Sequence, residues 1–398
     1  MAEAFAIPKG FKAAACSAGI KKSGKLDLAL ICADKPLECA GVFTTNKVVA
    51  APVKITESRV RQGLCQAILI NSGNANACTG AQGLRDARRC GDLVAESLDI
   101  APALVAVSST GVIGVPLPMY CFEDHVPTLC RMLKHDQFDG VSRAMMTTDA
   151  FPKMSGRTII VDGQEVRLLG LAKGAGMIHP DMATMLAFVI TDALLADGLL
   201  EQSLRQAVNG SFNRITVDRD TSTNDMALLL ASGEAENQEI TEGTSASEQF
   251  NGALNEIMLD LAKMIARDGE GATKLVRIQI NGAANGNDAL IAARSVATSQ
   301  LVKTAFFGED ANWGRIIAAV GYSGADVDPD QVSIMFDNVA MVSKGLGLGS
   351  EQEAKASEIL KQPEFTVTID LALGEGSAYY YTSDLTYDYV RINADYRS

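Results

Sequence analysis

Hydrophobic and polar positions along the chain follow two patterns, one typical of buried strands and the other of amphipathic helices. Short, mainly apolar runs predict strands over Leu28–Cys32, Gln66–Asn71, Ala103–Ser108, Thr158–Val161, Leu186–Thr191, Met226–Leu230, Lys274–Ile280, Val332–Phe336, Phe365–Leu371 and Ala378–Thr382. Apolar residues at helical spacing predict helices over Gly83–Leu98, Met119–Leu133, Leu194–Val208, Phe250–Arg267 and Asp288–Thr304.

Several local signals refine this pattern. We expect Pro127 to kink or interrupt its helix, and Gly269 to stop the helix that precedes it. The polar, acidic stretch 234–247 reads as a surface loop, and the alternation around Tyr387 and Tyr389 is typical of a half-buried strand. The order of elements lacks the strict alternation of a doubly wound sheet. It favours an α+β fold, a layered α/β sandwich with helices outside central sheets.

Composition restricts the class of protein. The length of 398 residues suggests two domains or one large α/β unit, and 47% hydrophobic with 21% charged residues excludes general disorder. A net charge of −13 argues against nucleic acid as a partner. No apolar run reaches about 18 residues, so no membrane span is expected, and the N-terminus lacks the pattern of a secretory signal.

Common catalytic and metal-binding motifs are missing from the sequence. There is no G-x-S-x-G elbow, Walker A motif or H-E-x-x-H motif. The chain has only three histidines, which argues against a histidine-based metal site or a Ser/His/Asp triad. Its eight cysteines form no C-x-x-C pair, which favours reduced, mostly buried thiols in a cytoplasmic protein.

The segment Lys173–Leu186 is the strongest candidate for chemistry. It contains Gly174, Gly176 and Pro180, and then places Ala183 directly before Thr184. Its plainest interpretation is a loop that enters a buried strand. The alternative is self-cleavage, in which a Thr hydroxyl attacks the preceding carbonyl and hydrolysis exposes a new N-terminal Thr. Such a residue carries a nucleophile and an amine base, with an ordinary pKa of about 7.7–8.0.

This segment resembles the signature of the ornithine acetyltransferase family, the self-cleaving glutamate N-acetyltransferases of arginine biosynthesis. Further stretches agree in order along the whole chain: Phe43–Asn46, Asn71–Ala77, Ser109–Gly114, Met146–Asp149, Asp220–Asp225, Ala266–Gly271 and Asn393–Ser398. There are two departures, because the family often has Asn where this chain has Asp181 and Thr where it has Ser398. Neither removes the hydroxyl nucleophile or the scissile bond.

The resemblance implies cleavage between Ala183 and Thr184. The products would be fragments 1–183 and 184–398, which together make one catalytic unit. Thr184 would then be the nucleophile that accepts the acetyl group. Thr110 and Gly111 would form the oxyanion hole, although on local sequence alone they read as a plain turn.

The resemblance also implies a set of substrate-binding residues, namely Thr147, Lys173, Thr184, Glu270, Asn393 and Ser398. Lys173 suits a carboxylate and Glu270 suits the ornithine ammonium. The plain alternatives are a surface lysine for Lys173 and a helix-end residue for Glu270. Roles for Asn393 and Ser398 would require a chain terminus that is packed rather than frayed.

The implied reaction moves an acetyl group from N-acetyl-ornithine to glutamate through an acetyl-Thr184 intermediate. The resemblance implies no cofactor, acetyl-CoA as a second donor in many members, and a cytoplasmic heterotetramer of two α and two β fragments. Two alternatives stay open. One is an N-terminal-nucleophile amidohydrolase or aminopeptidase, in which water accepts the acyl group. The other is an acidic scaffold that is never cleaved.

Overall fold

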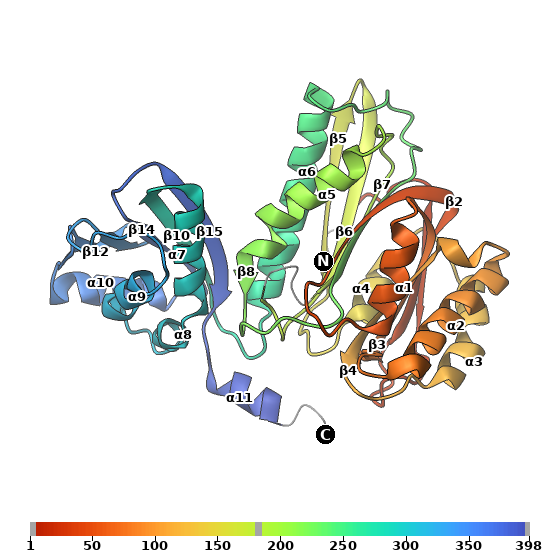
Figure 1. Cartoon of the computed structure of the whole chain (residues 1–398), viewed down its shortest axis with the longest axis horizontal. Coiled ribbons are helices and arrows are strands. Elements are labelled where there is room, and N and C mark those ends of the chain that lie inside the picture. Colours follow the sequence, from red (N-terminus) through yellow and green to blue (C-terminus); the bar gives the residue numbers. More distant parts are fainter. Residues whose placement is uncertain (1–4, 180–184, 395–398) are drawn as a thin grey trace. The chain divides into compact units, whose positions relative to one another are not determined.

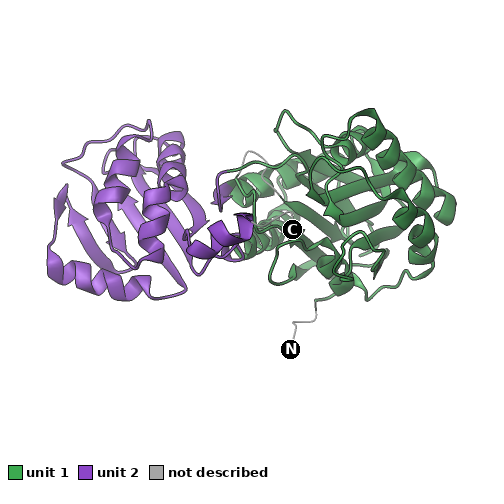
Figure 2. Ribbon diagram, turned by 90° about the horizontal axis from the view of Figure 1, so that it is seen from below, with its two compact units in different colours: residues 1–213, 220–265 green, residues 214–219, 266–398 purple. Residues whose placement is uncertain are grey.

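The protein forms two compact units, each built on one β-sheet (Figures 1 and 2). The computed structural model describes residues 5–179 and 185–394. Unit 1 comprises residues 1–213 and 220–265, and the remainder of the chain forms unit 2. The expected cleavage point, Ala183–Thr184, lies outside the described residues. A fragment beginning at residue 184 would contribute to both units.

The sheet of unit 1 has eight strands. They are β1 (Phe11–Cys16), β2 (Leu28–Phe43), β3 (Leu64–Asn74), β4 (Val105–Val112), β5 (Lys153–Val161), β6 (Gln164–Lys173), β7 (Leu186–Thr191) and β9 (Met226–Ala231). Their order is β4-β3-β2-β9-β7-β6-β5, with β1 paired to β2. β7 runs antiparallel to β6 and parallel to β9, so both neighbours flank the first residues after position 184.

Helices bury both faces of this sheet, which explains why its strands read as continuous apolar runs. In β3, Ile68 and Ile70 belong to one hydrophobic core, and Ala67 and Leu69 belong to the other. The helices of unit 1 are α1 (Ala51–Val60), α2 (Gly80–Leu98), α3 (Met119–Arg131), α4 (Phe138–Met145), α5 (Leu199–Gly210) and α6 (Ser245–Arg267), which ends at the boundary with unit 2.

Close packing between α6 and β6 depends on a glycine. A Cβ atom at Gly170 would lie 2.6 Å from Ile257 Cγ2 and 2.8 Å from Leu261 Cδ1. These distances are shorter than any ordinary van der Waals contact. Glycine therefore lets the apolar stripe of α6 lie directly on the sheet.

Unit 2 has a seven-stranded sheet in the order β13-β12-β11-β14-β10-β15-β8. Its strands are β8 (Ile215–Thr216), β10 (Leu275–Ala283), β11 (Ser333–Phe336), β12 (Val339–Ser343), β13 (Leu346–Gly347), β14 (Glu364–Asp370) and β15 (Gly376–Ser383). Its helices are α7 (Gly286–Thr298), α8 (Gln300–Phe307), α9 (Trp313–Gly321), α10 (Ser350–Leu360) and α11 (Tyr387–Ala394). A hydrophobic core lies between this sheet and α7 to α10.

The layered α+β arrangement and the predicted strands are confirmed, but four local predictions are wrong. The helix expected over Asp288–Thr304 is two helices, because Ser299 leaves helical geometry and its side chain caps α8. α3 continues past Pro127 to Arg131. The loop expected over residues 234–247 ends where α6 begins at Ser245. The strand expected around Tyr387 and Tyr389 is helix α11.

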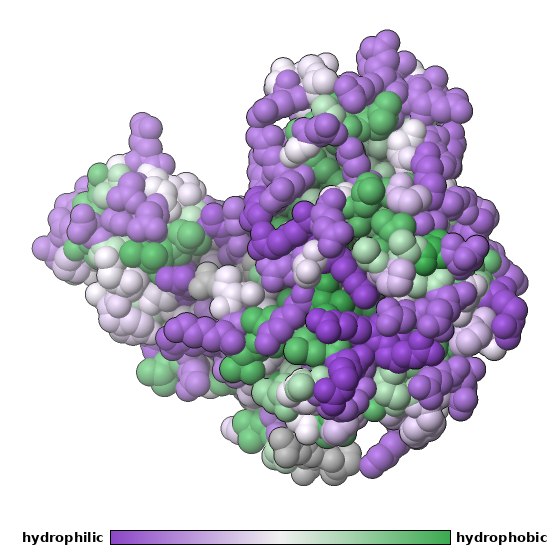
Figure 3. All heavy atoms as spheres, turned by 45° about the vertical axis from the view of Figure 1, so that its right-hand side comes forward, coloured by the Kyte–Doolittle hydropathy of each residue, from purple (hydrophilic) through white to green (hydrophobic). Residues whose placement is uncertain are grey.

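On the face shown in Figure 3, hydrophilic residues predominate and hydrophobic residues lie in groups between them. Within residues 5–179 and 185–394, no helix is long and apolar enough to cross a membrane. All eight cysteines are free thiols, as expected, and six of them are buried.

Lys303 on α8 is a buried cation in unit 2. It is 3% exposed, and its ammonium donates to Thr382 Oγ1 at 2.9 Å, to Ser383 Oγ at 3.2 Å and to the Ser383 carbonyl. Burial lowers the pKa of Lys303 to about 7, against the opposing effect of Asp384 and Asp218. In the unfolded chain the pKa of Lys303 is 10.5. Between pH ~7 and pH ~10.5 the unfolded chain therefore binds more protons than the folded protein does.

We predict that stability relative to a Lys303→Met variant rises with pH above about 7. The free energy of unfolding of the wild type should gain up to about 1.4 kcal/mol per pH unit over the variant. Chemical denaturation of both proteins at several pH values between pH ~6 and pH ~9 measures this difference. Lys355→Met, which removes an exposed lysine, is the control. Parallel pH curves for wild type and Lys303→Met would contradict the prediction.

Candidate active site

Thr110 and Gly111 lie within the end of β4 and not in a separate turn. β4 runs parallel to β3, with Thr110 opposite Ser72 and Gly111 opposite Gly73. Gly111 has φ of +135°, and a Cβ atom there would lie 2.3 Å from the carbonyl carbon of Gly73. Only glycine fits this close approach of two backbones. The backbone of Gly111 therefore lies directly against that of Gly73, in the residue after Thr110.

Lys173 brings three of the predicted site residues together. It is the last residue of β6, and its side chain is only 6% exposed, so the interpretation as a surface lysine is wrong. Its ammonium donates to Thr147 Oγ1 at 3.0 Å and to Thr110 Oγ1 at 3.4 Å. Thr110, Thr147 and Lys173 thus form one polar group at the end of the sheet, although they are distant in sequence.

A buried carboxylate, Asp149, holds this group in place. Asp149 Oδ1 accepts from the Lys153 ammonium and from the Gly174 backbone N–H, both at 2.7 Å. Its Oδ2 accepts from the Thr147 backbone N–H at 2.9 Å and lies 4.0 Å from the Lys173 ammonium. Burial alone would raise the pKa of Asp149, but Lys173 and Lys153 outweigh it and hold that pKa below its usual range. Asp149 is therefore a permanent anion.

The start of β7 lies between Lys173 and a second buried aspartate. Leu186 is opposite Lys173 on one side and Met226 on the other. Asp225, directly before β9, accepts the Met185 backbone N–H through Oδ1 at 2.8 Å. The described chain after position 184 therefore begins at the Lys173 group. The predicted residues Ala183 and Thr184 lie outside the described residues.

In unit 2, the structure brings together Glu270 and Asn393. Glu270 is buried, and its Oε2 accepts from Asn393 Nδ2 at 2.8 Å. Thr386 Oγ1 donates to the Gly271 carbonyl at 2.8 Å, which fixes the start of α11 against the loop after α6. These contacts join α11 to the loop after α6, but α11 contains no buried residue and Asn393 is exposed, so a packed C-terminal segment stays a prediction. The predicted residue Ser398 lies outside the described residues.

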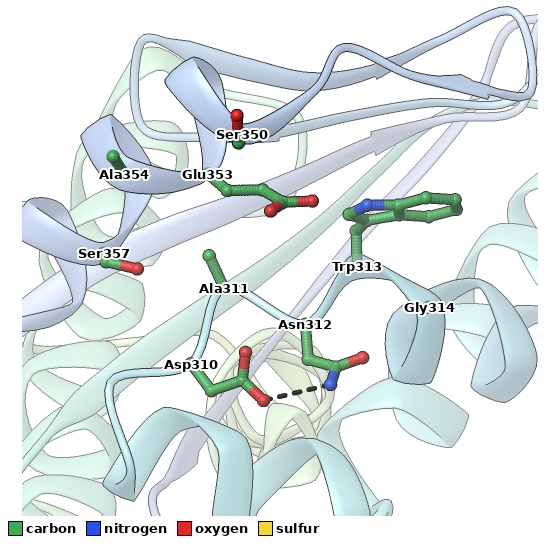
Figure 4. Close-up of a pocket in the computed structure, with 9 residues that line it drawn as sticks. All are labelled: Asp310, Ala311, Asn312, Trp313, Gly314, Ser350, Glu353, Ala354 and Ser357. Carbon is green, nitrogen blue, oxygen red and sulfur yellow. Dashed lines mark hydrogen bonds between the residues drawn. The ribbon is translucent and has the colours of Figure 1, made fainter.

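A separate cavity in unit 2 contains none of the predicted site residues. It lies between the starts of α9 and α10 and has a volume of about 560 Å³ (Figure 4). Trp313 and the carboxylate of Glu353 border it, and Asn312 Nδ2 donates to Asp310 Oδ2 at 3.0 Å. The predicted site residues that the structure describes thus form the Lys173 group in unit 1 and the Glu270–Asn393 pair in unit 2.

Each of these two groups has its own binding chemistry. An ammonium flanked by two hydroxyls attracts carboxylates and can stabilise an oxyanion. A buried glutamate with one amide partner suits an ammonium. Across the described residues, no cluster of three or more His, Cys, Asp or Glu side chains could hold a metal ion.

Sequence reasoning assigned no role to two residues that organise the site, Asp149 and Asp225. Both lie in stretches that carry the family resemblance, Met146–Asp149 and Asp220–Asp225, so that resemblance was the available signal. Lys21 was missed without any such signal. It donates to the Met146 carbonyl at 2.7 Å, and burial lowers its pKa to about 8.

Comparisons with known proteins identify the family of this chain. The ArgJ family model matches residues 12–398. The arginine biosynthesis bifunctional protein ArgJ of Syntrophotalea carbinolica is 61% identical over 389 residues, covering 98% of this chain and 99% of that protein. The protein of the same name from Geobacter sulfurreducens is 54% identical over 390 residues, with the same coverage of both chains.

A solved relative shares part of the fold. The arginine biosynthesis bifunctional protein argJ from Bacillus halodurans is 46% identical with a TM-score of 0.52, covering 53% of this chain and 99% of that chain. The family model spans nearly the whole sequence, and the two curated relatives match this chain along nearly their full length. The chain therefore belongs to the ArgJ family.

Proposed function

We propose that this protein is a glutamate N-acetyltransferase of arginine biosynthesis, which moves an acetyl group from N-acetyl-ornithine to glutamate. One observation carries the proposal most directly. The Lys173 ammonium and the Thr110 and Thr147 hydroxyls gather where the chain enters β7 at Leu186, two positions along the sequence from Thr184. The names of the relatives support a place in arginine biosynthesis.

Thr184 is the proposed nucleophile, released by self-cleavage of the Ala183–Thr184 bond. Its hydroxyl takes the acetyl group, and its own α-amine acts as general base. Thr110 and Gly111 stabilise the oxyanion of each tetrahedral intermediate through a hydroxyl and a backbone N–H. The position of the Thr110 hydroxyl, 3.4 Å from the Lys173 ammonium, supports this assignment.

Each proposed substrate residue has a charge that suits its role. Lys173, with Thr147 beside it, binds a substrate carboxylate. Glu270 binds an amino group of ornithine, with Asn393 holding the glutamate in position. Ser398 and the freed amine of Thr184 complete the proposed set.

The remaining proposals concern the context of the reaction. The enzyme needs no cofactor and uses acetyl-CoA as a second, weaker donor to glutamate. It works in the cytoplasm as a heterotetramer of two α and two β fragments. The competing proposal is an N-terminal-nucleophile hydrolase, and Lys173 argues against it because a buried cation beside two hydroxyls suits an amino-acid acceptor better than water.

Self-cleavage is the first prediction of this proposal. Intact-mass measurement of the purified protein should give two fragments, and N-terminal sequencing of the larger should begin Thr-Met-Leu-Ala. The solved chain from Bacillus halodurans supports cleavage. That chain matches over 99% of its own length but covers only 53% of the present sequence. A fragment of residues 184–398 would likewise be just over half of the sequence.

Two variants at one position test the nucleophile. Thr184→Ala should remain a single chain because it lacks the hydroxyl, whereas Thr184→Ser should still be cleaved because it keeps one. A wild-type protein that stays uncut while it catalyses acetyl transfer would refute the cleavage and with it the role of Thr184.

The oxyanion hole gives a second prediction. Thr110→Val keeps the shape of the side chain but removes the hydroxyl, and kcat should fall by about 10²–10³-fold with little change in KM. Thr110→Ser, which keeps the hydroxyl, should retain most of the activity. Steady-state kinetics and a melting curve for each variant measure this, and an unchanged kcat in Thr110→Val would exclude Thr110 from the site.

A covalent acetyl-enzyme gives a third prediction. Enzyme mixed with N-acetyl-ornithine alone should release a burst of ornithine and gain about 42 Da on the fragment that begins at Thr184. Added glutamate should discharge this fragment faster than water does. Intersecting double-reciprocal plots without a trapped fragment would favour direct transfer, and equally fast discharge by water would favour the hydrolase.

A further inference from the structure

A buried carboxyl oxygen with no partner faces the start of β7. Asp225 is 1% exposed, and its Oδ1 accepts the Met185 backbone N–H at 2.8 Å. Among the described residues, nothing hydrogen-bonds to its other oxygen, Oδ2. An unsatisfied buried oxygen is costly to a folded protein, so its retention calls for a functional explanation.

Asp192, at the opposite end of β7, shows what a purely structural aspartate looks like. It directly follows the strand and is fully buried. Its Oδ1 accepts from the Arg167 backbone N–H at 2.7 Å, and its Oδ2 accepts from the Lys9 backbone N–H at 3.0 Å. Both oxygens are therefore occupied. Both aspartates are buried and both accept a backbone N–H, but only Asp225 has an oxygen without a hydrogen-bond partner among the described residues.

The surroundings of Asp225 favour the protonated acid. Burial raises the pKa of Asp225 well above its usual range, and the Met185 N–H and the charge of Lys173 oppose this only in part. A neutral carboxyl group can both donate and accept a proton at one place. The carboxyl group of Asp225 also accepts the N–H of Met185. In the sequence, this peptide bond directly follows the proposed scissile bond.

We propose that Asp225 is the acid–base group of self-cleavage, a role that rests on the proposed cleavage between Ala183 and Thr184. Thr184 Oγ attacks the Ala183 carbonyl carbon, so a C–O bond forms and the C–N bond breaks. Asp225 gives its proton to the departing Thr184 nitrogen, which leaves as the amine. The resulting carboxylate receives the proton that the Thr184 hydroxyl loses.

This step is balanced in protons, because Asp225 is protonated again at its end. The product is an ester with the same mass as the uncleaved chain. Water then hydrolyses the ester, leaving a carboxyl group on Ala183 and a free hydroxyl on Thr184. No metal, oxidant or reductant takes part. One carboxyl group that first donates and then accepts a proton is sufficient for both proton transfers.

Two isosteric variants test this assignment. Asp225→Asn keeps an oxygen for the Met185 N–H but removes the acid, and Asp192→Asn makes the same change at the matched position. Purified full-length chains are followed by intact mass over time, with no substrate present. We expect Asp225→Asn to slow cleavage by at least about 100-fold, and Asp192→Asn to cleave at the wild-type rate.

Further measurements separate this proposal from simple loss of fold. Melting curves show whether Asp225→Asn is folded, and Asp225→Glu, which keeps a carboxyl group, should recover part of the rate. Cleavage of folded Asp225→Asn at the wild-type rate would overturn the proposal, as would equal slowing in Asp192→Asn. A wild-type chain that never cleaves would refute the proposed cleavage itself, which is a different result.

Discussion

The anion of Asp149 between two buried lysines is the interaction on which the centre of unit 1 depends. Asp149 pairs with the buried Lys153 at 2.7 Å and lies 4.0 Å from the buried Lys173, and removing one partner of a buried ion pair typically costs about 3–5 kcal/mol. The same carboxylate accepts the backbone N–H groups of Thr147 and Gly174. It therefore fixes the end of β6, and through Lys173 it sets the positions of the Thr110 and Thr147 hydroxyls.

Aspartates that accept backbone N–H groups recur at strand ends in both units. Asp225 binds the N–H of Met185 directly before β7. Asp384, directly after β15, accepts from the backbone N–H groups of Thr273 and Lys274 at 2.8 and 3.0 Å, before β10 begins. Such contacts restrain the chain where it leaves regular pairing. In unit 2 this restraint, together with the Thr386 contact, supports the loop that carries Glu270.

Much of the fold could be predicted from the sequence because its strands are buried on both faces, and runs such as Leu186–Thr191 and Met226–Leu230 are apolar throughout. Helix α11 could not be predicted in this way. Tyr387 is 82% exposed and Val390 is 64% exposed, so the helix has no apolar stripe and its start is held by side-chain hydrogen bonds. The sequence pattern predicts one helix in place of α7 and α8, because the capping residue Ser299 does not interrupt the spacing of apolar residues.

The candidate site was predictable only through the resemblance. From local sequence alone, Lys173 reads as a surface lysine and Thr110 as part of a turn. The spacing of residues indicates neither the burial of Lys173 nor its contact with Thr147. The roles of Asp149 and Asp225 depend on partners from other strands. Those partners are defined by sheet order, which the sequence pattern did not specify.

The strand order of unit 1 has a consequence for a chain cut after residue 183. β7 and β9 would then belong to one polypeptide, and their outer neighbours β6 and β2 to the other. Strands of the smaller fragment would thus flank those of the larger fragment on both sides, through the β6–β7 and β2–β9 ladders of backbone hydrogen bonds. Separating the fragments would require breaking both ladders of the sheet. The two fragments should therefore stay tightly associated without any covalent link.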